Sequence, residues 1–410
     1  MKNSYLKLSC FCCLLCLLVF PKPASCQVSQ PLSNARLLNA YRALKAWKQA
    51  ILSDPMNFTS NWYGPNVCNY TGVYCASALD DPNITTVAGI DLNHGDIAGS
   101  LPEELGLLTD LALFHLNTNR FCGTLPQSFC NLHLLYELDL SNNLFTGCFP
   151  SVVLSLPSLT YLDLRFNEFE GSVPSALFDL KLDAIFINNN KFRSSIPKNF
   201  GNSPVSVIVL ANNQLNGCFP SNLAKMEGTL DEINLMNTSL SGCLSQEIGN
   251  LTNLTVFEVS FNDLSGPLPE KMGGMKSLEQ LDVAHNNLSG EIPASICSLP
   301  RLENFTYSYN YFCSEPQSCL KLLDKDDSLN CIPGRPLQRS PQECASFLAH
   351  PPSTEAPTPL LFPQSPLPLQ SSLPRPALQP CPPPSPHPAF ATTAMKSLLG
   401  VWDARHGLTK

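Results

Sequence analysis

One motif returns along most of this chain at an almost constant interval. The stretch LDLSNNLFTGCFP at 138–150 recurs as LDLRFNEFEGSVP at 162–174, FEVSFNDLSGPLP at 257–269 and LDVAHNNLSGEIP at 281–293. The second apolar residue of each L-x-L unit lies 23 to 25 residues from the next, at Leu92, Leu116, Leu140, Leu164, Ile187, Leu210, Leu235, Val259, Val283 and Tyr307. Ten such units predict a solenoid of ten stacked coils, because each unit can bury its apolar side only against its neighbours.

The pattern within each coil predicts an α/β solenoid of the plant-type leucine-rich repeat, with ten coils of ~24 residues. The L-x-L residues predict a short parallel strand, stacked ~4.8 Å from the next, with apolar side chains pointing inward. An asparagine three residues later can satisfy backbone groups in the turn, at 119, 143, 167, 190, 213, 262, 286 and 310. Gly95 and Thr238 take this place in two coils, where we expect a weaker ladder. The G-x-[IL]-P half is typical of the plant-type repeat, whose family adds a second strand and twists the array into a superhelix.

An N-terminal cap is predicted at 27–86, because a terminal coil would otherwise leave its core in water. One face of a predicted helix carries Leu37, Tyr41, Leu44, Trp47 and Ile51. Asp54-Pro55 should end this helix, and Cys68 with Cys75 should form a disulfide in the cap.

The repeats should cover 87–312, followed by a cysteine-rich C-terminal cap and hinge at 313–350. Coil ten, YSYNYFCSEP, lacks both the motif glycine and the motif proline, so we expect it to close the array. The cap holds Cys313, Cys319, Cys331 and Cys344, whose connectivity the sequence leaves open. Cys218 and Cys243 each follow the motif glycine in adjacent coils, which predicts a disulfide between them.

The ends of the chain differ in composition from the repeats. Residues 1–26 have two lysines before an apolar run and small residues after it, which predicts a secretory signal peptide. No other stretch approaches the ~20 apolar residues of a membrane helix. Residues 351–410 predict a disordered Pro-rich tail, in which CPPPSP at 381–386 holds Cys381. We therefore expect a secreted, extracellular protein.

Charge and cysteine content fit that setting. The formal net charge of −8 disfavours nucleic acid and anionic membranes as partners and favours cationic ones. Twelve cysteines lie between Cys68 and Cys344, an even number that predicts disulfides in an oxidising compartment. Eight N-x-S/T sequons predict N-glycosylation at Asn57, Asn69, Asn83, Asn237, Asn250, Asn253, Asn287 and Asn304.

Residues ~40 to ~350 resemble the leucine-rich repeat extensins of plant cell walls. The resemblance rests on AWKQAILSDPMNFTSNW, VAGIDLNHGDIAGSLPEELGLLTDLALFHLNTNRFCGTLP, FDLKLDAIFINNNKF and NCIPGRPLQRSPQEC. It implies a role in cell-wall formation and polarised growth, contact with wall polymers, and binding of basic, cysteine-rich rapid alkalinization factor peptides. It also implies an ability to form disulfide-linked homodimers. The tail departs from the family, because it has no Ser-Pro-Pro-Pro block and no tyrosine.

The concave face is the predicted peptide-binding surface. Residues beside the inward leucines should line it, and they form acidic groups around an exposed apolar centre. The predicted site residues are Glu137, Asp139, Tyr161, Asp163, Phe186, Val207, Val209, Glu232, Glu258 and Asp282. An acidic residue inside L-x-L also serves solubility alone, so each single aspartate has this simpler interpretation.

Two other functions compete with peptide binding. Inhibitors of pathogen polygalacturonases share the ten-coil repeat and an acidic concave face, and a structural wall scaffold would use its repeats to bind pectin. Catalysis is not expected, because we place the carboxylates on an open, hydrated face where burial would not raise the pKa of a general acid. The scattered histidines predict no metal site, and no cofactor motif occurs.

Overall fold

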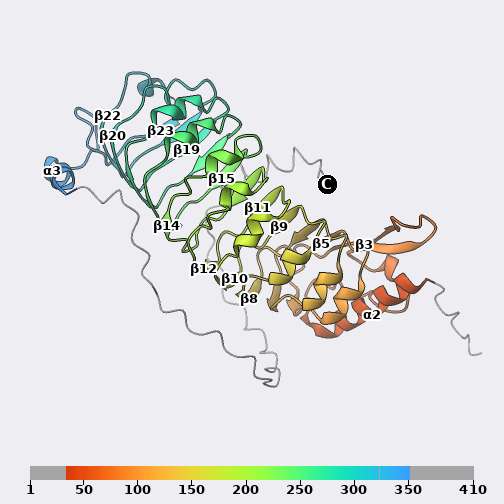
Figure 1. The fold of residues 1–410 in the computed structure, drawn as a ribbon. Helices are drawn as coiled ribbons and strands as arrows, with labels where there is room; N and C mark the ends of the chain where they lie inside the picture. Colours follow the sequence, from red (N-terminus) through yellow and green to blue (C-terminus); the bar gives the residue numbers. More distant parts are fainter. Residues whose placement is uncertain (1–33, 323, 351–410) are drawn as a thin grey trace, which may run out of the picture.

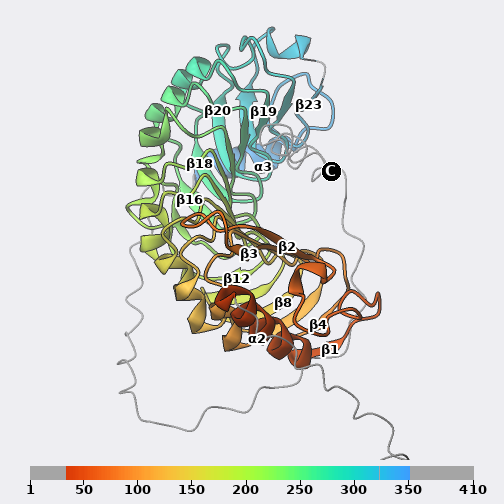
Figure 2. The same ribbon diagram turned by 90° about the vertical axis from the view of Figure 1, so that its right-hand side faces the viewer.

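The computed structural model of the protein describes residues 34–322 and 324–350. The predicted signal peptide (1–26) and Pro-rich tail (351–410), with Cys381, lie outside the described residues. The chain winds into a curved stack of coils running from α2 to α3 (Figure 1). The main sheet lies on the inner, concave side of the stack, and the short helices lie on the outer side (Figure 2). The predicted leucine-rich repeat solenoid is confirmed.

The main sheet has twelve strands in the described residues. In ten of them, the second apolar residue of the predicted L-x-L unit directly follows the strand. All neighbours in it are parallel apart from the antiparallel pair β2 and β3. Its strands are β2 (Val73–Ser77), β3 (Thr85–Asp91), β5 (Leu113–His115), β7 (Glu137–Asp139), β9 (Tyr161–Asp163), β11 (Ala184–Phe186), β13 (Val207–Val209), β15 (Glu232–Asn234), β17 (Val256–Glu258), β19 (Gln280–Asp282), β21 (Asn304–Thr306) and β23 (Asp324–Asp326).

Two further sheets follow the second half of the repeats, as the plant-type motif predicts. The six-stranded sheet contains β1 (Ile51–Ser53), β4 (Ala98–Gly99), β6 (Arg120–Gly123), β8 (Leu144–Cys148), β10 (Glu168–Gly171) and β12 (Lys191–Phe192). The five-stranded sheet contains β14 (Gly217–Cys218), β16 (Leu240–Gly242), β18 (Asp263–Gly266), β20 (Asn287–Glu291) and β22 (Tyr311–Ser314).

Short 3₁₀ helices cover the outer side, and five of those in the described residues begin directly after the proline of the repeat motif. Proline suits this position because its fixed φ and missing N–H cost nothing where a helix begins. The helices are η1 (Val67–Asn69), η2 (Glu103–Leu107), η3 (Gln127–Asn131), η4 (Ser151–Ser155), η5 (Ser175–Asp179), η6 (Phe200–Asn202), η7 (Leu223–Met226), η8 (Gln246–Asn250), η9 (Glu270–Gly274) and η10 (Cys319–Lys321).

The asparagine ladder forms as predicted. Asn167 is buried, and its amide donates to the carbonyl oxygens of Leu140 in the preceding coil (2.9 Å) and Leu164 in its own coil (3.1 Å). Its oxygen accepts from the Phe145 amide at 3.0 Å. Thr238 is shorter, and its hydroxyl donates to its own coil's Leu235 oxygen at 2.8 Å. No hydrogen bond from Thr238 to the preceding coil is found among the described residues, in line with the weaker ladder expected there.

The N-terminal cap is the helix α2 (Ala35–Ala50), which begins at the side-chain cap of Asn34. Trp47 is fully buried and packs its ring 5.6 Å from Phe114 and 5.7 Å from Phe121. The prediction that the helix continues through Ile51 is wrong. Ile51 begins strand β1, which pairs antiparallel with β4 and gives the β-branched side chain a pleated position.

The C-terminal cap contains an additional strand. β23 pairs parallel with β21, so an eleventh, shorter coil follows the tenth, and the prediction that coil ten closes the array is wrong. Asn330 takes the ladder position, with its amide 3.0 Å from the Tyr307 carbonyl oxygen and its oxygen 3.1 Å from the Phe312 amide. The helix α3 (Pro341–Ala349) then ends the described chain.

Candidate functional site

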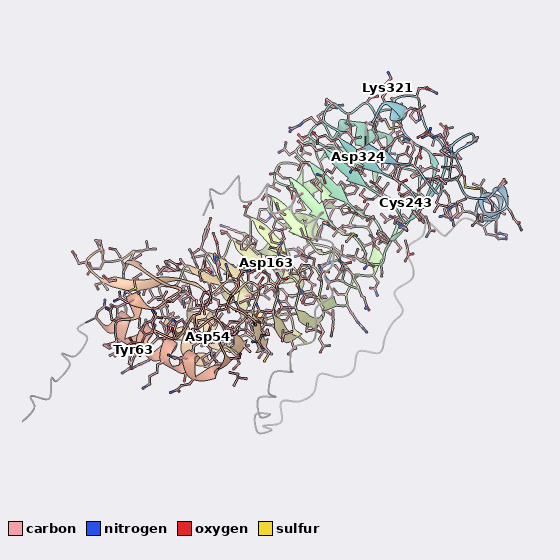
Figure 3. The ribbon with its side chains drawn as sticks, turned by 180° about the vertical axis from the view of Figure 1, so that it is seen from behind. Asp54, Tyr63, Asp163, Cys243, Lys321 and Asp324 are labelled. Atoms are coloured by element: carbon pink, nitrogen blue, oxygen red, sulfur yellow. A yellow bond between two sulfur atoms is a disulfide. The ribbon has the colours of Figure 1, made fainter. Side chains whose placement is uncertain are left out.

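The ten predicted site residues lie on consecutive strands of the main sheet, from β7 to β19. Registered pairs bring Asp139 beside Asp163, Phe186 beside Val209, and Glu258 beside Asp282. Figure 3 shows Asp163 near the middle of the array and Asp324 near its C-terminal end. The predicted residues therefore form one band along the concave face.

The apolar centre of this band is not an exposed patch, contrary to prediction. Phe186, Val207 and Val209 are 6%, 5% and 5% exposed, and they pack with Ala184 and Ala211 into a small cluster of their own. Coils only ~4.8 Å apart allow side chains on neighbouring strands to cover one another. The ring of Tyr161 lies 5.7 Å from that of Phe186, and the Arg165 guanidinium lies over the Phe186 ring at 5.0 Å.

The N-terminal half of the face carries cations of its own. His115 Nε2 lies 3.0 Å from Glu137 Oε2, and Arg165 Nε lies 2.8 Å from Asp163 Oδ2. Burial alone would lower the pKa of His115, but the hydrogen bond to Glu137 and the charge of Asp139 raise it overall. Acidic groups in this half are thus already partly neutralised.

Asp163 is the most buried acid of the face. Its side chain is fully inaccessible, and burial raises the pKa of its carboxyl to about 8 in spite of the opposing charge of Arg165. Burial and the nearby charge of Asp163 also raise the pKa of Tyr161. The charge of Asp163 therefore depends on pH in the neutral range.

The C-terminal half contains a carboxyl pair, Glu258 and Asp282. Burial first, and the neighbouring Asp282 second, raise the pKa of Glu258 to about 8, and burial also raises the pKa of Asp282. Each carboxyl accepts a backbone N–H, from Ser260 at 2.8 Å and Ala284 at 2.9 Å. No cation contributes to the pKa shift of either group among the described residues.

The expectation of a hydrated face with unshifted carboxyl groups is therefore wrong. The coils place the acids close together and bury them, so charging them costs free energy that an added cation would offset. The face can therefore bind cationic side chains, and the position that favours them most is the Glu258 and Asp282 pair, which has no neighbouring cation among the described residues.

Sequence reasoning missed a column of aromatic side chains that begins on the same coils as this pair. Phe261, His285 and Tyr309 each precede the ladder asparagine, and they stack in sequence with ring centroids 4.0 and 3.9 Å apart. Phe261 is 51% exposed and Tyr309 is 40% exposed. The signal was available as F-N, H-N and Y-N at intervals of 24 residues. We call these three residues the aromatic ledge.

Cysteine pairing agrees only in part with the predictions. Cys68 and Cys75 form the predicted cap disulfide, and the C-terminal cap has the pairs Cys297–Cys319 and Cys331–Cys344. The free, exposed thiols in the described part of the chain are Cys130, Cys148, Cys218, Cys243 and Cys313, so the even count did not predict pairing throughout.

The predicted bond between Cys218 and Cys243 is wrong. The motif glycines of β14 and β16 do not lie opposite each other, because the register is offset by two residues. Cys218 therefore lies opposite Ser241 and not opposite Cys243. Two residues at ~3.3 Å each, combined with a ~4.8 Å strand spacing, separate the Cα atoms by ~8 Å. That separation exceeds the ~7 Å limit for a disulfide.

The predicted glycosylation sites are mostly accessible. Asn57, Asn69, Asn83, Asn237, Asn250 and Asn253 are exposed, and Asn287 and Asn304 are half-buried. The amide of Asn304 lies 3.4 Å from Asp324 Oδ2, at the C-terminal end of the main sheet. Glycosylation at these positions stays a prediction.

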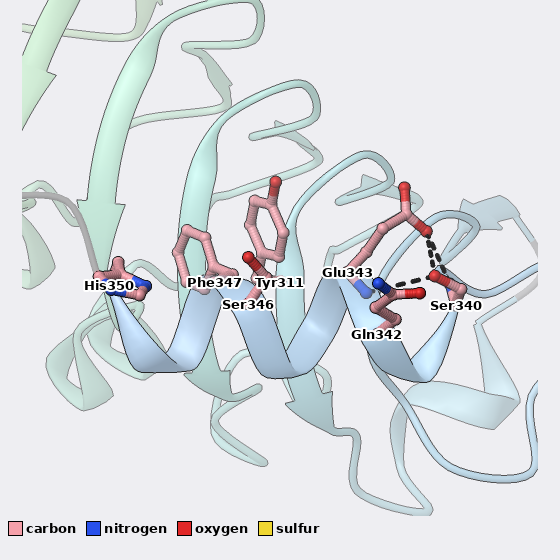
Figure 4. A pocket seen from close by; sticks show the side chains of 7 residues that line it. All are labelled: Tyr311, Ser340, Gln342, Glu343, Ser346, Phe347 and His350. Atoms are coloured by element: carbon pink, nitrogen blue, oxygen red, sulfur yellow. Dashed lines mark hydrogen bonds between the residues drawn. The ribbon is translucent and has the colours of Figure 1, made fainter.

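A hollow of about 520 Å³ lies between β22 and α3 (Figure 4). Phe347 of α3 stacks on Tyr311 of β22 with centroids 3.6 Å apart, and the Arg339 guanidinium lies 4.2 Å from the Tyr311 ring. The lining residues are Tyr311, Ser340, Gln342, Glu343, Ser346, Phe347 and His350. This hollow is separate from the main sheet, because Tyr311 belongs to the second-half sheet.

Within residues 34–322 and 324–350, no cluster of three or more His, Cys, Asp or Glu side chains could hold a metal ion. None of the helices in that part of the chain is long and apolar enough to span a bilayer.

Comparison with known proteins identifies the family. The leucine rich repeat N-terminal domain matches residues 38–76, and leucine rich repeat models match 133–192 and 277–299. Leucine-rich repeat extensin-like protein 6 of Arabidopsis thaliana is 66% identical over 322 residues, covering 78% of this chain and 68% of that protein. The chain belongs to the leucine-rich repeat extensin-like proteins. Protein 7 of this family in the same plant is 68% identical over 318 residues, covering 78% of this chain and 73% of its own length.

Solved structures with similar coils include plant receptor ectodomains. The Arabidopsis receptor kinase HAESA, in complex with the peptide hormone IDA and the co-receptor SERK1, superposes with a TM-score of 0.58 at 27% identity. The match covers 71% of this leucine-rich repeat extensin-like chain and 53% of the receptor chain. The GASSHO1/SCHENGEN3 ectodomain of the same plant, with a TM-score of 0.59 and 23% identity, shares the fold, and the match covers 72% of this chain and 37% of that chain.

Proposed function

We propose that this protein is secreted to the cell wall and regulates wall formation, wall assembly and polarised growth by binding basic, cysteine-rich rapid alkalinization factor peptides. The observation that carries the proposal is the band of buried or half-buried carboxyl groups along the concave face. Asp139, Glu258 and Asp282 face one side of the sheet, and their burial favours a cationic ligand.

Family and fold support a peptide as the ligand. HAESA, which shares the coils of this chain, is described in complex with a peptide hormone. An open concave sheet gives an extended or folded peptide many neighbouring side chains to contact at once. The net charge of −8 adds long-range attraction for a basic partner.

We favour binding over catalysis for the Glu258 and Asp282 pair. A pair of glycosidase carboxyl groups is separated by ~5 to 9.5 Å so that a sugar or water fits between them. Glu258 and Asp282 instead lie directly opposite each other on strands ~4.8 Å apart, and each carboxyl is turned to a backbone N–H of its own coil. Burial is the main cause of the raised pKa values of both carboxyl groups, and a bound cation would offset the cost of charging them.

The competing function is inhibition of a pathogen's wall-degrading enzyme. The two proposals differ in the size and kind of the partner. A polygalacturonase assay with the purified chain should show undiminished activity if peptide binding is the function. Inhibition at nanomolar concentrations, without affinity for basic peptides, would favour the inhibitor.

Isothermal titration of the full secreted chain with a folded rapid alkalinization factor peptide tests the proposal. We expect saturable binding with a dissociation constant below micromolar, weakened by added salt because charge contributes to it. Heat signals no larger than those of an acidic peptide of equal length would contradict the proposal.

A disulfide-linked homodimer is part of the same proposal. The exposed thiols of Cys130, Cys148, Cys218, Cys243 and Cys313 are candidates for an intermolecular bond in an oxidising compartment. Non-reducing electrophoresis should show a dimer band that one Cys→Ser substitution among these five removes.

A further inference from the structure

The aromatic ledge and the carboxyl pair occupy the same three coils. Glu258, Asp282 and Thr306 are registered neighbours on β17, β19 and β21. Phe261, His285 and Tyr309 follow them by three residues each. The two features also share a neighbour, because the charge of Asp326 on β23 acts on both Asp282 and His285.

We propose that the aromatic ledge, with Glu258 and Asp282 beside it, is the docking position for a guanidinium side chain of the basic peptide. This inference rests on the proposed peptide-binding function and names the chemistry of one contact. Aromatic ring faces attract cations, and a guanidinium is planar and weakly hydrated, so it can stack on a ring while its N–H groups reach carboxylates.

The protein uses the same pairing in its own structure. The Arg165 guanidinium lies over the Phe186 ring at 5.0 Å while Arg165 Nε contacts Asp163. In the C-terminal cap, the Arg339 guanidinium lies 4.2 Å from the Tyr311 ring centre. Around the ledge, rings and carboxyl groups are present, and no ion pair joins an arginine to Glu258 or Asp282 among the described residues. A ligand arginine would make the ring and carboxylate contacts there that Arg165 makes in the N-terminal half.

The charge state of the ledge suits a cation. Burial lowers the pKa of His285, with Arg339 acting in the same direction and Asp326 in the opposite one. The lowered pKa of His285 favours the neutral imidazole, which does not repel a guanidinium as the charged form would. Apart from His285, no other aromatic ring is stacked on Phe261 or Tyr309 among the described residues.

The test uses the full secreted chain with carbon-labelled histidine, observed by NMR. N-acetylarginine amide is titrated into it, and the His285 signal is assigned by its loss in His285→Gln. We expect a saturable shift with a millimolar dissociation constant, and none with the neutral citrulline analogue. An equal shift with citrulline, or no shift with arginine, overturns the proposal, and both comparisons are made on the wild-type chain.

Variants then locate the contact. Tyr309→Leu and Glu258→Gln should each weaken the arginine-induced shift and the affinity for the basic peptide about 5- to 20-fold, the range expected for one desolvated cation–π or charge contact. Phe166 lies in the same column, four coils before Phe261, and Phe166→Leu should leave both the shift and the peptide affinity unchanged. If the wild type and both variants bind the basic peptide equally well, the proposed docking position at the ledge is refuted and the proposed function stands. Binding of the arginine amide without binding of any basic peptide refutes the proposed function and leaves the ledge standing.

Discussion

At the scale of single residues, the carboxyl group of Asp163 determines how the concave face responds to pH. Its pKa of about 8 and that of Glu258 lie far above the ordinary carboxyl value, so the folded chain binds more protons than the unfolded chain between pH ~4 and ~8. The free energy of unfolding should therefore fall as the pH rises through this window. His115, whose raised pKa lies above its ordinary value, acts in the same direction at the upper end.

Asp163→Asn should flatten this dependence, because the amide does not titrate. We expect the wild type to lose on the order of 2 kcal/mol more stability than the variant between pH 5 and pH 8. Urea unfolding at both pH values measures it. Parallel pH profiles for the two proteins would show that Asp163 titrates normally.

The ladder asparagine is the second residue-scale feature. Asn167→Ala leaves the buried Phe145 amide without its partner. It also removes one of two asparagine donors from each of the Leu140 and Leu164 oxygens, which keep Asn143 and Asn190. We expect a loss of ~2 to 4 kcal/mol in the free energy of unfolding, from the desolvation of these groups. Asn66→Ala is the matched control, since Asn66 is exposed and its side chain makes no cap hydrogen bond. Equal unfolding midpoints for both variants would refute the ladder's contribution.

At the scale of elements, one buried side chain adds to the backbone pairing that holds the last strand. Asn330 ties β23 to the preceding coil through the Tyr307 oxygen and the Phe312 amide. Asn330→Ala should speed amide hydrogen exchange in β23 at least about 10-fold, because local opening becomes easier by ~1.4 kcal/mol or more. Exchange in β9 serves as the internal reference and should not change. Unaltered exchange in β23 would show that Asn330 does not stabilise the strand beyond its backbone pairing with β21.

The same scale shows what the sequence could predict and what it could not. The L-x-L spacing predicted strands β3 to β21, since stacking demands one strand per coil. It could not predict β23, because the sequence Asp324–Asp326 lacks the apolar L-x-L pattern and pairs through its backbone. The stagger between β14 and β16 also has no sequence signature, so Cys218 and Cys243 looked closer than they are.

At the scale of the whole molecule, the array turns a short repeat into one continuous surface. The position of each concave residue followed from the period alone, and the structure brings the ten predicted residues into one band. Their burial did not follow from the period, because it depends on which side chains become neighbours across coils. Phe186 against Val209 and Glu258 against Asp282 are such neighbours.

The central claim is that the concave carboxyl groups bind a basic peptide, and a charge-matched comparison tests it most directly. Asp139→Lys with Asp282→Lys changes the concave face. Glu104→Lys in η2 with Glu227→Lys at the end of η7 makes the same change in net charge on the outer side. Isothermal titration with a folded rapid alkalinization factor peptide should show at least a 100-fold loss of affinity for the concave variant, corresponding to ~2.7 kcal/mol, and less than a threefold loss for the outer variant. Equal affinity losses in the two variants would mean that only net charge matters, and would contradict the account.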